Sequence, residues 1–231
     1  MSVNSKHSTL ASAYDEKYKR ASYFKYRAWL YQPFVRAVIR KARLKPGFSI
    51  LDVGCGQGFF TCIFANLGLQ SVGVDISEEG IQSARREYAS SGASFEVADV
   101  LSLNREGQYD CVFVRGLSLY NSPEFKRTRS TTNVLLSYLK PGGVLIFDYH
   151  STLSPKKKSE SWIFHSRSDV REHFSAYPAA KTYFSLRVET LLLGSWSFCV
   201  PFTLLAALVS RFTGLGGELI VLLPRPAVSM A

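Results

Sequence analysis

A run of apolar residues that ends in three closely spaced glycines constrains this chain more than any other feature. Residues 48–53 are mostly apolar, and Gly54, Gly56 and Gly58 follow at every second position. Such a run predicts a buried parallel strand, and the glycines allow a tight turn into a helix expected over 59–67. Because glycine lacks a Cβ, this turn can bring backbone N–H groups and a helix N-terminus close to a ligand.

Two further apolar segments lead to carboxylates. The strand expected over 71–75 ends in Asp75, and the strand expected over 94–98 is followed by Asp99. Asp75 lies about 20 residues after the first glycine, where an acid usually holds the hydroxyl pair of a ribose. Phe59 stands where a dinucleotide-binding fingerprint has its third glycine, which disfavours a pyrophosphate cofactor. The ligand is therefore expected to carry a ribose.

The order of these segments resembles that of class I S-adenosylmethionine-dependent methyltransferases, whose first motif often reads Asp-Val-Gly-Cys-Gly-x-Gly, as residues 52–58 do. The resemblance covers roughly residues 45–150. It implies an α/β, Rossmann-like fold with a seven-stranded, mostly parallel sheet in the order 3-2-1-4-5-7-6, the last strand being antiparallel. It also implies S-adenosylmethionine as cofactor, with S-adenosylhomocysteine as product.

The same resemblance assigns the cofactor contacts. The glycine turn would pack against the methionine part, Asp75 would hold the ribose hydroxyls, and Asp99 would bond the adenine amino group. The full set of implied cofactor residues is Gly54, Cys55, Gly56, Gly58, Asp75, Ile76, Asp99, Val100, Arg115 and Gly116.

The segment after the fourth expected strand, 109–114, argues against a nucleic-acid base as acceptor. It reads Arg-Gly-Leu-Ser-Leu-Tyr from Arg115 to Tyr120. It therefore lacks the Asn/Asp-Pro-Pro-Tyr/Phe motif of enzymes that methylate exocyclic or amide nitrogens. It also lacks the Pro-Cys nucleophile of cytosine-C5 enzymes.

Three residues are candidates for direct action on the acceptor. His150 follows the strand expected over 144–149, and its imidazole could serve as a general base because it titrates near neutrality. The alternative is a loop histidine hydrogen-bonded to backbone. Tyr120 and Tyr149 are candidates for ring contacts or hydrogen bonds. The sulfonium is already activated, so a base is needed only where the acceptor must lose a proton.

Residues 1–44 are expected to form basic, aromatic-rich helices that precede a methyltransferase domain over 45–231. One interpretation is a lid over cofactor and substrate, with Tyr14, Tyr18 and Arg27 as substrate contacts. The other is a basic amphipathic face that packs on the sheet edge.

The charge of the chain points to an anionic partner. The formal net charge is +10, and residues 1–45 hold eleven Lys/Arg against two acids. A small anionic molecule is the favoured partner. RNA, or a protein substrate that docks on the basic helices, is the alternative, although no RNA-binding module is recognisable. A non-catalytic scaffold with a methyltransferase-like fold is a further alternative, disfavoured by the intact glycines and acids.

The last third of the chain is less regular. A surface loop is expected over 151–166, with Trp162 as a candidate substrate contact. Residues 191–210 carry no charge over 20 positions, which is the length of a membrane span, but Gly194 and Pro201 interrupt them. An apolar helical insertion at about 195–214, buried or lining the substrate site, is therefore expected instead of a span. Peripheral docking on a membrane is the alternative.

The four cysteines show no metal-binding or disulfide spacing, and no metal site is expected. Buried free thiols are typical of a reducing compartment, so a cytoplasmic location is expected; the polar N-terminus does not resemble a signal peptide. The oligomeric state has no signature in the sequence.

Overall fold

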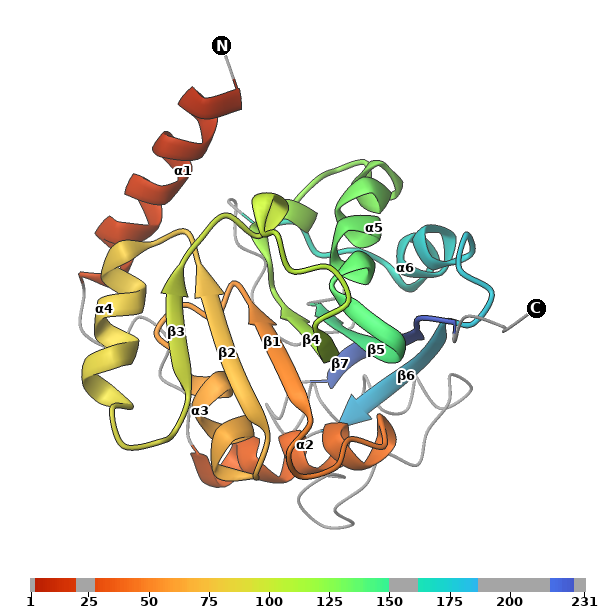
Figure 1. Cartoon of the computed structure of the whole chain (residues 1–231). Coiled ribbons are helices and arrows are strands. Elements are labelled where there is room, and N and C mark those ends of the chain that lie inside the picture. Colours follow the sequence, from red (N-terminus) through yellow and green to blue (C-terminus); the bar gives the residue numbers. More distant parts are fainter. Residues whose placement is uncertain (1–2, 20–27, 150–161, 187–216, 227–231) are drawn as a thin grey trace.

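The fold is built on one seven-stranded sheet, which Figure 1 shows in a computed structural model that describes residues 3–19, 28–149, 162–186 and 217–226. The strands follow the order β3-β2-β1-β4-β5-β7-β6. Neighbouring strands from β3 to β5 pair in parallel, whereas β7 runs antiparallel to both β5 and β6. This confirms the predicted fold class. The strands are β1 (Ser49–Val53), β2 (Gln70–Asp75), β3 (Ser94–Val97), β4 (Tyr109–Arg115), β5 (Leu139–Tyr149), β6 (Lys181–Leu186) and β7 (Gly217–Pro224).

Helices cover both faces of the sheet (Figure 1). Short 3₁₀ segments lie at η1 (Val100–Ser102), η2 (Ser118–Tyr120) and η3 (Phe125–Thr128). The α-helices are α1 (Val3–Tyr18), α2 (Ala28–Lys41), α3 (Phe59–Asn66), α4 (Glu78–Glu87), α5 (Arg129–Ser137) and α6 (Arg167–Phe174).

The N-terminal region consists of two helices with different surroundings. Helix α2 belongs to the core, because Phe34, Val35 and Val38 are fully buried in one cluster with residues of α3 and of the sheet. Helix α1 instead packs on α4, at the upper left of Figure 1. Of the two described helices in the expected 1–44 lid, α1 thus packs on α4, whereas α2 is part of the core.

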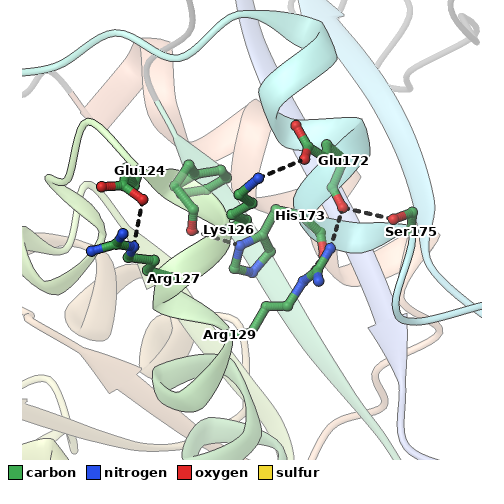
Figure 2. A network of polar contacts seen from close by, with 8 residues as sticks. Glu124, Lys126, Arg127, Arg129, Glu172, His173 and Ser175 are labelled. Atoms are coloured by element: carbon green, nitrogen blue, oxygen red, sulfur yellow. Dashed lines mark hydrogen bonds and ion pairs between the residues drawn. The ribbon is translucent and has the colours of Figure 1, made fainter.

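A polar and aromatic network joins α6 to the segment before α5 (Figure 2). The Arg129 guanidinium donates to the backbone carbonyls of Glu172 and His173, at 2.5 and 3.0 Å. His173 Nδ1 lies 3.0 Å from the Phe125 carbonyl, and its Nε2 lies 2.9 Å from Thr132 Oγ1. A carbonyl can only accept, so Nδ1 carries a proton; because burial lowers the pKa of His173 to about 4, the imidazole is neutral at neutral pH and Nε2 is the acceptor.

Two expected elements differ in length from the prediction. The recurring apolar positions Leu135, Leu136 and Leu139 predict one helix over 123–139, but this segment is divided into η3 and the shorter α5. Pro141, Gly142 and Gly143 predict a break between that helix and the strand expected over 144–149, but they lie within β5, where the pairing register with β4 shifts. Backbone bonds between Gly142, Gly143 and Arg225 hold this irregular stretch, which local propensity does not reveal.

Several predicted features lie outside the described residues. They include His150, Arg27, most of the 151–166 loop and the 195–214 insertion. Within the described part of the chain, no helix is long and apolar enough to cross a membrane.

Candidate active site

The glycine turn closes tightly against β2. Gly54, Gly56 and Gly58 have φ angles of 70°, 53° and 82°, in the left-handed region that favours glycine. The Gly54 N–H donates to the Val74 carbonyl at 2.8 Å. A Cβ at Gly58 would lie 2.6 Å from the Phe95 ring, so β3 also limits this turn to glycine.

Asp75 organises the turn from the end of β2. Its Oδ2 accepts a bond from the Gly56 N–H at 2.8 Å, and its Oδ1 accepts one from the Ser77 N–H at 2.9 Å. Burial raises the pKa of this carboxyl, and the two backbone donors oppose that effect. Each carboxylate oxygen can accept two bonds, so Asp75 retains acceptor capacity for a ligand.

The end of β3 exposes apolar side chains around an acid. Asp99 Oδ1 accepts a bond from the Leu101 N–H at 2.9 Å and starts η1. Val97 and Leu101 on either side of Asp99 are 43% and 36% exposed, which is high for large apolar residues in the described part of the chain. Val100 is buried, and Ile76 is partly buried beside Asp75.

The C-terminal end of α1 lies directly over this turn. Tyr18 is 7% exposed, and a Cβ added at Gly56 would lie 2.7 Å from its hydroxyl oxygen. A Cβ at Gly80 would lie 3.0 Å from the same ring. The Tyr14 ring stacks on Tyr18 with centroids 6.0 Å apart. The structure therefore brings two of the predicted lid residues to the glycine turn.

An aspartate that the sequence did not single out attaches α1 at this position. Asp15 Oδ1 accepts a bond from the Ser77 hydroxyl at 2.5 Å and from the Glu79 N–H at 3.3 Å. Ser77 also caps α4 by accepting from the Gly80 N–H at 3.0 Å. The available signal was the spacing of Asp15 and Tyr18, which places both on one face of a helix.

A pair of stacked rings lies beside Gly116. The Tyr149 and Trp162 centroids are 5.8 Å apart at 26°, and Trp162 Cζ2 is 4.0 Å from the position of a Gly116 Cβ. Within the described residues, the buried Trp162 Nε1 has no hydrogen-bond partner. Burial, followed by the charge of Tyr14, raises the pKa of Tyr149. The Tyr149 hydroxyl donates to the Tyr120 carbonyl at 3.3 Å.

Tyr120 occupies the core. It is fully buried, and its hydroxyl lies 2.9 Å from Thr132 Oγ1. Since Thr132 also bonds Nε2 of His173, the hydroxyl belongs to the same network that joins α5 and α6. Burial raises the pKa of Tyr120. This placement favours a structural role for Tyr120 over a direct contact with an acceptor.

Arg115 forms a buried ion pair with Asp148 across the ends of β4 and β5. Its guanidinium also lies 5.0 Å from the centroid of the Phe60 ring and 5.7 Å from that of Tyr31. The side chain of Arg115 therefore joins α2 and α3 to the sheet.

Two titratable groups lie at the glycine turn, Asp52 at the end of β1 and Cys55 within the turn. Burial raises the pKa of Asp52 to about 7, against the effect of a 2.6 Å bond from the Thr61 hydroxyl. Burial also raises the pKa of the Cys55 thiol. Cys55, Cys62 and Cys111 are free thiols. No group of three potential metal ligands occurs in the described part of the chain.

The sheet order, the glycine turn after β1 and the acids after β2 and β3 together define the fold of class I methyltransferases. A family model described as a methyltransferase domain matches residues 44–188. A crystal structure of magnesium protoporphyrin IX methyltransferase from Synechocystis PCC 6803 with bound S-adenosylmethionine has a TM-score of 0.62 and 16% identity, covering 94% of this chain and 96% of that one.

Curated relatives are more similar in sequence but longer. A putative methyltransferase of Geobacillus sp. (strain WCH70) is 31% identical over 156 residues, which cover 66% of this chain and 62% of that protein. The ubiquinone biosynthesis O-methyltransferase of Bordetella avium (strain 197N) is 32% identical over 117 residues, covering 49% of this chain and 46% of that protein. The alignments thus span less than two thirds of these relatives.

The chain belongs to the methyltransferase domain family, within the class I S-adenosylmethionine-dependent methyltransferases. S-adenosylmethionine is the methyl donor of this class. The resemblance seen in the sequence is thereby confirmed.

Proposed function

We propose that this chain transfers a methyl group from S-adenosylmethionine to an O, N or C atom of a small molecule that is anionic or partly apolar. The observation that carries this proposal is the Tyr149–Trp162 ring pair beside Gly116. Stacked aromatic side chains next to Gly116, which follows the end of β4, suit a compact, partly apolar acceptor. The name of the Bordetella relative, an O-methyltransferase of ubiquinone biosynthesis, supports a small-molecule acceptor.

The residues around the glycine turn fit the cofactor. Asp75 retains acceptor capacity for two ribose hydroxyls while backbone donors hold its carboxylate in place. The exposed Val97 and Leu101 offer apolar surface for an adenine ring next to Asp99. The remaining proposed contacts are Gly54, Cys55, Gly56, Gly58, Ile76, Val100 and the backbone of Arg115 and Gly116.

Catalysis in this proposal depends mainly on alignment. The bound cofactor supplies an activated methyl group, and the protein must hold the acceptor in line and exclude water. Tyr149 is a poor candidate for the general base. Burial raises its pKa, so the hydroxyl keeps its proton, which it donates to a backbone carbonyl. We retain His150 as the general base for acceptors that must lose a proton. Tyr14, Tyr18, Arg27 and Trp162 remain proposed acceptor contacts.

Calorimetric titration with S-adenosylmethionine tests the cofactor assignment. Asp75→Ala should weaken binding at least tenfold, because it removes the ribose acceptor and releases the Gly56 N–H. Glu87→Ala, an exposed change at the other end of α4, should bind as the parent does. Equal affinity of the parent and Asp75→Ala would refute the assignment.

Assays with fractions of a cell extract test which class of molecule accepts the methyl group. Formation of S-adenosylhomocysteine would be measured with the small-molecule, RNA and protein fractions of a cell extract. Turnover with small molecules that falls in Trp162→Ala supports the proposal. Turnover with the RNA or protein fraction alone supports the alternative acceptors, and cofactor binding without turnover in any fraction supports a scaffold.

A cytoplasmic location is part of this proposal. It is supported by the free thiols of Cys55, Cys62 and Cys111, which are typical of a reducing compartment.

A further inference from the structure

The outer face of α2 and the turn after it form a strongly basic surface. The five cationic side chains are exposed, and no Asp or Glu occurs anywhere between positions 28 and 48. The set, which we call the α2 basic surface, is Arg36, Arg40, Lys41, Arg43 and Lys45.

None of the described neighbouring residues supplies this surface with a carboxylate partner. The segment 59–70, which includes α3, also contains no Asp or Glu. Across the described residues, no carboxylate forms an ion pair with any member of the α2 basic surface. Lys41 instead lies 4.7 Å above the Tyr183 ring. By contrast, Lys126 and Arg127 near α5 are each paired with a glutamate.

Two members of the α2 basic surface, Arg36 and Arg40, line an open apolar groove. The groove has a volume of about 320 Å³, and its lining alternates two arginines with apolar side chains but includes no aromatic ring. Its lining residues are Arg36, Ile39, Arg40, Pro46, Leu67 and Leu69.

An exposed tryptophan extends the same face of α2. Trp29 is 61% exposed, and it precedes Arg36 by seven residues and Arg40 by eleven. These spacings place all three side chains on one side of a helix. Phe34 and Val38, on the opposite side of α2, are buried in the core. This packing fixes the orientation of the helix and keeps its outer face towards the surface.

We propose that the α2 basic surface docks this protein on membranes that contain anionic phospholipids. Exposed Lys and Arg side chains are attracted to such surfaces, and a tryptophan beside them suits the headgroup region. The apolar groove between Arg36 and Arg40 complements a lipid, which carries apolar groups next to its phosphate. This inference rests on the α2 basic surface and its groove, and it is independent of the proposed acceptor.

RNA is a poorer match for this surface. Single-stranded RNA binding uses aromatic rings on which bases stack, and the groove lining has none. The groove also lies beside Pro46 and Leu69, before β1 and β2 begin, whereas the glycine turn follows the end of β1. Five strand residues at about 3.3 Å each separate the two places by roughly 16 Å. RNA held at the groove would therefore be remote from the methyl donor.

Vesicle flotation with the full chain tests the proposal. The probes are vesicles of phosphatidylcholine alone and of phosphatidylcholine and phosphatidylserine in equal parts. We expect binding to the anionic vesicles only, decreasing as salt rises. Arg36→Glu/Arg40→Glu should lower the partition coefficient about tenfold or more, and Arg36→Lys/Arg40→Lys should retain most of the binding.

A charge-matched control separates the α2 basic surface from net charge. Arg167 and Arg171 on α6 are exposed, lie four residues apart as Arg36 and Arg40 do, and form no ion pair with a described residue. Arg167→Glu/Arg171→Glu should therefore leave vesicle binding within about twofold of the parent. Circular dichroism would verify that both variants are folded.

Three results would overturn the proposal. The first is an absence of binding to anionic vesicles by the parent. The second is an equal loss of binding in both charge-reversed variants, which would show that net charge alone is responsible. The third is tighter binding of single-stranded RNA than of anionic vesicles in the same buffer, lost in Arg36→Glu/Arg40→Glu, which would assign the surface to RNA.

Discussion

The Ser77 hydroxyl donates a 2.5 Å hydrogen bond to Asp15, and this contact ties the end of α1 to the start of α4. Ser77 also donates its backbone N–H to Asp75, the proposed ribose acid. One residue thus connects the helix over the glycine turn with the carboxylate that organises the turn.

We predict that loss of this contact raises the KM for S-adenosylmethionine more than it changes kcat. Asp15→Ala removes the acceptor that holds α1, so Tyr18 should no longer be kept against Gly56. The KM for S-adenosylmethionine should rise about fivefold or more, with a smaller change in kcat, in steady-state assays of S-adenosylhomocysteine formation. Glu16→Ala, whose side chain pairs with Lys19 on the exposed side of α1, is the matched control and should behave as the parent. Unchanged KM in Asp15→Ala would contradict a positioning role.

A second prediction concerns Gly56. Gly56→Ala places a methyl group 2.7 Å from the Tyr18 hydroxyl at a positive φ, so cofactor affinity should fall at least tenfold. Gly92→Ala is the matched control, because Gly92 also has a positive φ but nothing within 4 Å of the added atom. Both variants should lose about 1–2 kcal/mol of stability from backbone strain, whereas only Gly56→Ala should lose affinity in calorimetric titration. An equal loss of affinity in Gly56→Ala and Gly92→Ala would show that backbone strain, and not the contact with Tyr18, lowers the affinity.

The buried ion pair between Arg115 and Asp148 should be costly to break. Arg115→Met leaves a carboxylate buried without its cationic partner and should lower the free energy of unfolding by about 3–5 kcal/mol, measured by urea denaturation. Arg115→Met/Asp148→Leu should recover much of that loss. Lys126→Ala removes an exposed pair with Glu172 (Figure 2) and should change stability by about 1 kcal/mol or less. A loss in Arg115→Met no larger than in Lys126→Ala would contradict this prediction.

Stability should also fall in mild acid because of His173. Burial lowers the pKa of His173 to about 4, below its ordinary value of 6.5, and the pKa of His165 is lowered as well. The unfolded chain then binds protons more readily than the folded one. Full stability is therefore present above pH 6.5 and is lost as the pH falls from 6.5 towards 4.

Urea denaturation at neutral pH and near pH 5 measures this effect. We expect the parent to lose about 2 kcal/mol between the two, since each pKa unit corresponds to about 1.4 kcal/mol. His173→Gln keeps polar atoms near Phe125 and Thr132 but cannot titrate, so it should be less stable at neutral pH and less sensitive to acid. Parallel acid profiles in parent and variant would refute the assignment to His173.

Local patterns in the sequence were sufficient to predict the strands of the parallel sheet and the glycine turn. Alternation of apolar runs with helical segments predicted the strands, and the glycine spacing predicted the turn, because both depend on neighbouring residues and on backbone sterics. Asp75 and Asp99 could be found because acids at the ends of parallel strands necessarily lie at one edge of the sheet. The strand order came from the family resemblance, and the structure confirms it.

Only the tertiary structure decided which side chains meet around that framework. The contact of Asp15 with Ser77 joins residues 62 positions apart, and no local pattern encodes it. Tyr120 follows a predicted strand as a site residue would, yet packing against Thr132 directs its hydroxyl into the core. Periodicity predicts that one face of α2 is buried and the other basic, but not that the basic face has no ion pair with a described residue and borders an apolar groove. Such features depend on what the neighbouring elements place opposite each side chain, which the folded chain alone determines.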